Sequence, residues 1–96
     1  MMKYSVALKV VAINNVFNDL NKLLYTCQDK RGIFYEFVSE AKIPIYNYIA
    51  MEFNNFTVVK GTIRPIGFSV YPLNVKDNKL YLYRTCYKSG KYPKIN

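Results

Sequence analysis

The stretch Phe53–Tyr87, FNNFTVVKGTIRPIGFSVYPLNVKDNKLYLYRTCY, carries the clearest fold signal in the chain. Runs of apolar and β-branched residues alternate there with short clusters of Asn, Gly and Pro. Asn and Gly tolerate positive φ and Pro presets φ, so such clusters favour turns. The pattern predicts turns at residues 53–56, 64–67 and 76–79, and therefore an antiparallel meander of four strands.

The expected turns also predict which residues face each other. A two-residue loop at residues 54–55 suits Asn-Asn, because type I′ turns need positive φ at both positions. The expected pairs are Phe53 with Phe56 around the first turn, and Val75 with Leu80 and Leu73 with Leu82 around the last. The leucine face of the last hairpin is the expected core.

The opposite face of this hairpin is the expected binding surface, because side chains alternate between the two faces of a strand. Aromatic rings can stack nucleobases and lysines can neutralise phosphates. A purely structural interpretation remains open, since aromatic residues also favour half-buried sheets. The candidate residues are Tyr81, Tyr83 and Tyr87 for stacking, Phe68 on the same face for nucleic-acid or partner binding, and Lys76, Lys79, Lys88 and Lys91 for phosphate contact.

The segment Asn15–Gln28 is predicted to be an amphipathic helix. Its apolar residues recur at helical spacing, Asn14 and Asn15 offer an N-cap, and Gly32 offers a stop. The apolar stripe, which would pack on the sheet, consists of Ile13, Val16, Phe17, Leu20, Leu23, Leu24 and Cys27.

Two further runs flank this segment. Residues 3–11 alternate as a strand, with Tyr4, Val6, Leu8 and Val10 on one face and Lys9 on the other, wet face. Residues 33–38 are also expected to form a strand, although 35–42 could be a short helix. Residues 45–53 allow either a helix or a strand, and the turns that follow favour a strand.

These elements predict one α+β domain spanning residues 1–96, with a basic tail at 88–96. One helix would pack on a mainly antiparallel sheet of five to six strands, in the order strand, helix, strand and four-strand meander. Ninety-six residues suffice for a single core. No run approaches the roughly 20 apolar residues of a membrane span, so a soluble, cytoplasmic protein is expected.

Charge points to polyanionic partners. The chain has 14 Lys and Arg against six Asp and Glu, a net charge of +8. Most of the basic residues are lysines, which suit phosphate contacts better than base readout. The abundance of Lys, Asn, Ile, Tyr and Phe is typical of AT-rich genomes, which suggests a phage, virus or mobile element.

Catalysis finds little support in the composition. The chain has no histidine, so the usual general base at neutral pH is missing. The carboxylates are scattered, the glycines are isolated, and Cys27 and Cys86 have no histidine with which to bind a metal. We expect no catalytic residues, cofactor or metal, and we interpret both cysteines as buried thiols, although a bridge between them is left open.

The predicted function is therefore non-enzymatic binding of nucleic acid or of a nucleoprotein complex. One alternative is a protein-interaction module, either an inhibitor of a host defence complex or a homo-oligomer such as a dimer. A second alternative is a metal-free basic ribonuclease toxin. Binding to a phosphate backbone should weaken steeply with salt, whereas an aromatic protein interface should not.

Overall fold

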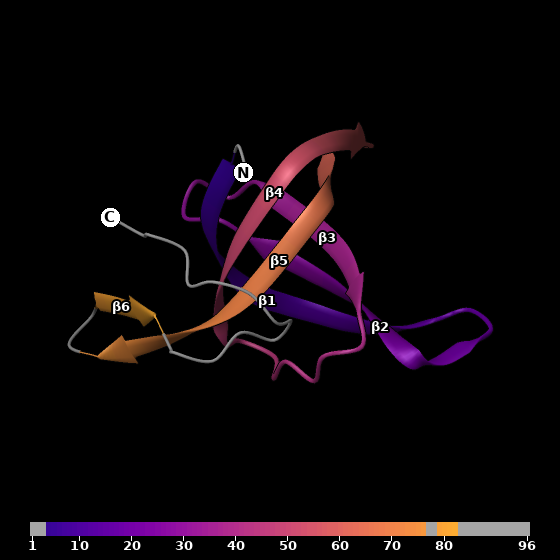
Figure 1. Cartoon of the computed structure of the whole chain (residues 1–96), viewed down its shortest axis with the longest axis horizontal. Helices are drawn as coiled ribbons and strands as arrows, with labels where there is room; N and C mark the ends of the chain where they lie inside the picture. Colours follow the sequence, from indigo (N-terminus) through magenta and orange to yellow (C-terminus); the bar gives the residue numbers. More distant parts are fainter. Residues whose placement is uncertain (1–3, 77–78, 83–96) are drawn as a thin grey trace.

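The computed structural model describes residues 4–76 and 79–82, and the side chains of residues 4–73. Over these residues the chain forms six strands and no helix (Figure 1). The strands are β1 (Tyr4–Val16), β2 (Asp19–Gln28), β3 (Phe34–Ser39), β4 (Tyr48–Val59), β5 (Thr62–Lys76) and β6 (Lys79–Leu82). The predicted α+β class is therefore wrong, because the described chain is all-β.

Five of the strands close into a Greek-key barrel. β1, β2 and β3 form an antiparallel meander, and β4 returns to pair with β1, so the spatial order is β3-β2-β1-β4. This order defines a Greek key. β5 then pairs antiparallel with β4 and meets β3 in parallel at Tyr35 and Ile63, which closes the barrel. β6 extends the end of β5 as a hairpin (Figure 1).

β1 is the strand around which this barrel is built, because it changes partner along its length. Residues 4–9 pair with β4, and residues 9–16 pair with β2. The register with β2 shifts between Val10 and Ala12, and such a bulge bends a strand. The expected alternation is confirmed at Leu8 and Val10, which are fully buried, whereas Tyr4 is exposed.

The predicted helix at residues 15–28 is wrong, and the segment instead forms the end of β1, a turn and β2. Asn18 has a φ of 61°, which reverses the chain directly after Phe17. Tyr25 and Cys27 point into the core, with the less buried Thr26 between them, so the burial period is two. Pairing with β1 on one side and β3 on the other overrides the helical spacing, since local propensity is a weak prior.

Two of the three predicted turns are also wrong. β4 continues through residues 54–55 and β5 through residues 64–67, so Phe53 pairs with Phe68 and not with Phe56. The chain turns instead at Lys60 and Gly61, with φ values of 50° and 80°. Positive φ at both central residues is what a tight hairpin needs. The last hairpin is confirmed in register, with Val75 opposite Leu80 and Leu73 opposite Leu82.

Gly67 has a special place within β5. Its φ is 62°, and a Cβ there would lie 2.9 Å from Nδ2 of Asn54 on β4. The inward positions of β5 change parity at this residue: Phe68 and Val70 pack on the core on one side, and Ile63 does so on the other. Glycine thus allows β5 to direct apolar side chains toward the core on both sides of this position.

The segment at residues 40–47 connects β3 to β4 and helps to fill one end of the barrel. Ile43 is buried, and its N–H donates to the Tyr25 hydroxyl at 3.0 Å. The same hydroxyl donates to the carbonyl of Ala41. The strand interpretation is confirmed for β3 and from Tyr48 in β4, and neither run is helical.

The core combines aliphatic residues with stacked rings. The rings of Tyr25 and Phe37 stack with centroids 5.3 Å apart, and Tyr35 meets Phe53 edge-on at 6.4 Å. Such aromatic pairs add to the energy of burial. The fully or nearly fully buried members of the core are Leu8, Val10, Tyr25, Cys27, Tyr35, Phe37, Ile43, Ile49, Met51, Phe53 and Val70. In the part of the chain that the structure describes, no helix is long and apolar enough to cross a membrane.

Candidate binding surface

The predicted site residues fall mostly outside the region where side chains are described. Tyr83, Tyr87, Lys88 and Lys91 lie outside the described residues altogether. The backbones of Lys76, Lys79 and Tyr81 lie in the β5–β6 hairpin. Phe68 is half-buried, packs against the core and meets the ring of Phe37 edge-on at 5.4 Å. The platform on the last hairpin therefore stays a prediction.

The structure brings together other aromatic and basic side chains than those predicted, namely Lys9, Tyr46 and Tyr48. We call this group the aromatic–lysine cluster. Lys9 of β1 and Tyr48 of β4 are register neighbours. The Lys9 ammonium lies 5.6 Å from the ring centroid of Tyr46 and 5.8 Å from that of Tyr48. Both distances allow a cation–π interaction. The cluster thus presents one positive charge between two rings.

Tyr46 is held in an unusual backbone conformation. Its φ is 68°, a value that bulky residues seldom adopt. Its N–H donates to the carbonyl of Val10 at 2.7 Å, and the Val10 N–H donates to the carbonyl of Asn47 at 2.9 Å. The side chain remains 63% exposed. A strained backbone that displays a ring to solvent is a feature that functional sites share.

Lys9 is not neutralised by a carboxylate among the residues whose side chains are described. Three other basic residues are paired: Lys22 with Asp19 at 3.8 Å, Arg31 with Asp29 at 3.8 Å, and Arg64 with Glu36 at 2.5 Å. Within residues 4–73, the Lys9 charge is thus shared only with aromatic rings. An anionic group that approaches the cluster would meet no acidic partner of this lysine there.

The positive charge is unevenly distributed along the chain. Residues 4–73 contain seven Lys and Arg and five Asp and Glu, a net charge of +2. The other residues therefore carry +6 of the total of +8, mostly after position 73.

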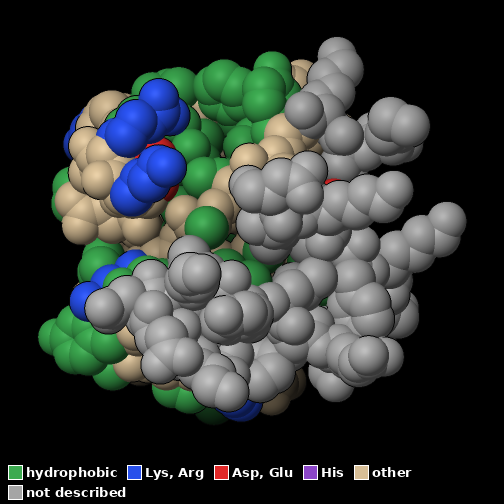
Figure 2. Space-filling view, turned by 90° about the vertical axis from the view of Figure 1, so that its left-hand side faces the viewer, with side chains coloured by type: hydrophobic (Ala, Val, Ile, Leu, Met, Phe, Trp, Pro, Cys, Tyr) green, Lys and Arg blue, Asp and Glu red, His purple; other side chains and the backbone are tan. Residues whose placement is uncertain are grey.

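Figure 1 places the β2–β3 turn on the side of the molecule that faces the viewer in Figure 2. Lys and Arg side chains gather on the upper part of that face.

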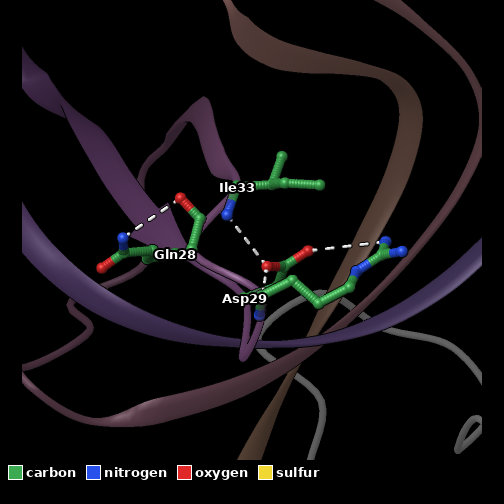
Figure 3. Close-up of polar contacts among 5 residues, drawn as sticks. Gln28, Asp29 and Ile33 are labelled. Atoms are coloured by element: carbon green, nitrogen blue, oxygen red, sulfur yellow. Dashed lines mark hydrogen bonds and ion pairs between the residues drawn. The ribbon is translucent and has the colours of Figure 1, made fainter.

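The β2–β3 turn is organised by Asp29, which is 8% exposed. Its Oδ1 accepts hydrogen bonds from the N–H groups of Arg31 at 2.9 Å and Ile33 at 3.0 Å (Figure 3). Burial, with the Asp29 charge as a second cause, raises the pKa of Tyr35 above its usual value. These hydrogen bonds give Asp29 a structural role in the turn, and they do not point to a ligand.

A second exposed feature is the end of the β1–β2 hairpin, which we call the arm: residues 11–22. It projects away from the barrel (Figure 1). Phe17 is 89% exposed and Leu20 is 94% exposed. Asp19 and Lys22 pair with each other, so the arm carries no net charge. A projection with exposed apolar side chains and no net charge favours a protein contact over a phosphate contact.

The aromatic–lysine cluster was missed in the sequence, although part of its signal is present. Alternation places Lys9 on the wet face of its strand, and it gives Tyr46 and Tyr48 the same parity in the later run. What the sequence alone does not predict is that these two runs pair. The choice of partner strand is a long-range property, and no local turn encodes it.

The fold and the cluster define the class of the protein: a small five-stranded Greek-key barrel with an aromatic–lysine surface. The chain matches no family model, and searches among curated proteins and solved structures return no significant match. None of these findings supports the expected phage, viral or mobile-element origin. Among the described residues, no three His, Cys, Asp or Glu side chains are grouped as a metal site would need.

Proposed function

We propose that the protein binds single-stranded nucleic acid without catalysis, using the aromatic–lysine cluster as a stacking site. The observation that carries the proposal is the Lys9 ammonium, 5.6 and 5.8 Å from the ring centroids of Tyr46 and Tyr48, of which Tyr46 is 63% exposed. Ring faces stack any base, and a nearby cation attracts the phosphate that follows it. The cluster thus combines both contacts that sequence-independent binding needs.

Architecture supports the same proposal by analogy. Five-stranded Greek-key barrels include the OB-fold, whose outer sheet face and loops bind oligonucleotides or oligosaccharides in many proteins. Fold alone does not determine function, so the weight rests on the cluster. The charge after position 73 would add sequence-independent attraction to the phosphate backbone.

The test is fluorescence anisotropy with labelled single-stranded DNA and RNA and with a duplex of the same length. We expect Tyr46→Gly to weaken single-strand binding by roughly 5- to 150-fold, because one stacked base contributes about 1–3 kcal/mol. Glycine also suits the φ of 68° at this position, so the melting temperature should change little. Tyr46→Phe keeps the ring and should keep the affinity.

Two results would contradict the proposal. One is unchanged affinity in Tyr46→Gly and Tyr48→Ala variants that remain folded. The other is affinity that does not change with salt between roughly 50 and 200 mM, because binding to phosphates releases counterions.

The variants Lys88→Gln and Lys91→Gln test the predicted tail contacts. Each should reduce the slope of log affinity against log salt concentration by at most about 0.7.

A further inference from the structure

We propose that the arm is a dimerisation element, and that its partner is the arm of a second copy of this chain. The proposal is independent of the nucleic-acid function. It rests on three observations: a strand edge that has no partner among the described strands, exposed apolar side chains, and absence of net charge in residues 11–22 of a strongly basic protein.

Unpaired edges are the first observation. β1 pairs with β4 only through residues 4–9, and Val10 bonds to residues 46 and 47. Beyond Val10, the outer edge of β1 has no neighbour among the described strands over residues 11–16. A free edge of this length is a template for pairing with another chain. A two-stranded ribbon is also marginal by itself and gains stability from more strands.

Apolar side chains at both ends of this edge are the second observation. A two-fold axis makes the paired edges antiparallel, and so each tip lies beside the base of the partner's arm. Phe17 is at the tip and is 89% exposed. At the base, Ile45 is 45% exposed and directly precedes Tyr46, whose N–H donates to the carbonyl of Val10. Antiparallel pairing therefore brings each exposed Phe17 toward the exposed Ile45 of the other copy.

Charge is the third observation, and it identifies the occupant. Each chain carries +8, so two copies repel each other through their net charge. The charged residues of the arm are Asp19 and Lys22, which are paired with each other at 3.8 Å. Two arms can therefore meet without like-charge repulsion at the contact. A nucleic-acid strand would gain little from the same neutral surface.

The experiment is sedimentation equilibrium on the nuclease-treated full chain over roughly 1–100 μM, where micromolar dissociation constants are measurable. We expect a mass of twice 11.3 kDa at the upper concentrations. The variant Asn14→Lys/Asn15→Lys places like charges on both edges and should raise the dimer Kd by about tenfold or more, with partial recovery in high salt. Phe17→Ser should weaken the dimer in the same direction.

A matched control separates the edge from charge in general. Ser5→Lys adds a lysine to an exposed position of the same strand, opposite Glu52, outside the free edge. It should leave the dimer intact. A monomeric native chain at the highest concentration overturns the proposal, and so does a dimer that persists in both arm variants. If arm variants of a monomeric chain lose oligonucleotide binding, the arm contacts nucleic acid and the proposal is overturned.

Discussion

Cys27 illustrates how the barrel interior changes the chemistry of a single side chain. The thiol is fully buried, and burial raises its pKa from 9.0 to about 12. The folded protein therefore keeps this thiol protonated at pH values where the unfolded chain releases the proton. The sequence predicted the burial correctly but for the wrong reason, since Cys27 lies on a strand and not on a helical stripe.

We expect the free energy of unfolding to fall as the pH rises above about 9, by about 1.4 kcal/mol per pH unit from Cys27. The sign follows because the folded state holds more protons than the unfolded state between pH 9.0 and about 12. The raised pKa of Tyr35 acts in the same direction. Urea unfolding at a series of pH values measures the slope.

The control for this expectation is Cys27→Ala, which removes the ionising group. Its stability should be lower at neutral pH because of the lost packing, but it should decline less steeply above pH 9. Equal slopes in the native chain and the variant would show that the thiol does not contribute.

Turns are the elements that the sequence predicted least consistently. The hairpin register around residues 76–79 was confirmed because the polar pair lies between two apolar runs that are close in sequence and pair with each other. Asn54-Asn55 was wrong because residues opposite in β5 continue the ladder, which stabilises the strand beyond a locally plausible turn. The segment at residues 15–28 was wrong for a related reason, since two neighbouring strands satisfy its backbone.

The β2–β3 turn offers a direct test of what holds an element in place. Asp29→Ala removes the acceptor of two backbone N–H groups, and we expect it to lower the free energy of unfolding by about 1–3 kcal/mol. Asp29→Asn keeps an acceptor oxygen and should restore most of this loss. Denaturant unfolding of both variants measures the difference.

Asp19→Ala is the matched control for Asp29→Ala. The Asp19 carboxylate accepts from the Asn21 N–H at 3.0 Å in an exposed setting, so its loss should cost less than about 1 kcal/mol. Losses of similar size at the two positions would mean that burial of the turn carries no extra energy.

At the scale of the whole molecule, closure of the barrel depends on a narrow seam. β4 and β5 pair from Tyr48 to Val59, whereas β3 and β5 meet in a single bridge between Tyr35 and Ile63. Arg64 reaches across this seam to Glu36 at 2.5 Å. Local alternation in the sequence predicted individual strands. It did not predict closure of the barrel, because closure joins residues that lie far apart in the chain. The sequence did not predict the aromatic–lysine cluster for the same reason.

We expect the seam to be the weakest part of the barrel in native-state hydrogen exchange. Arg64→Gln should speed exchange of the amides in Phe34–Ser39 while the global free energy of unfolding changes by less than about 1 kcal/mol, because the arginine is half exposed. Arg31→Gln breaks an ion pair that does not cross the seam and should leave these amides unaffected. Equal effects from both variants would contradict a weak seam.

The division of β1 between two partners also has a consequence for the order of synthesis on the ribosome. Residues 4–9 pair with residues 48–53, which are made about 40 positions later. At roughly 5–20 residues per second, this half of the strand waits about 2–8 s in the nascent chain before its partner exists. The meander of the first three strands can form in that interval, and it leaves residues 4–8 as an unpaired strand available to chaperones.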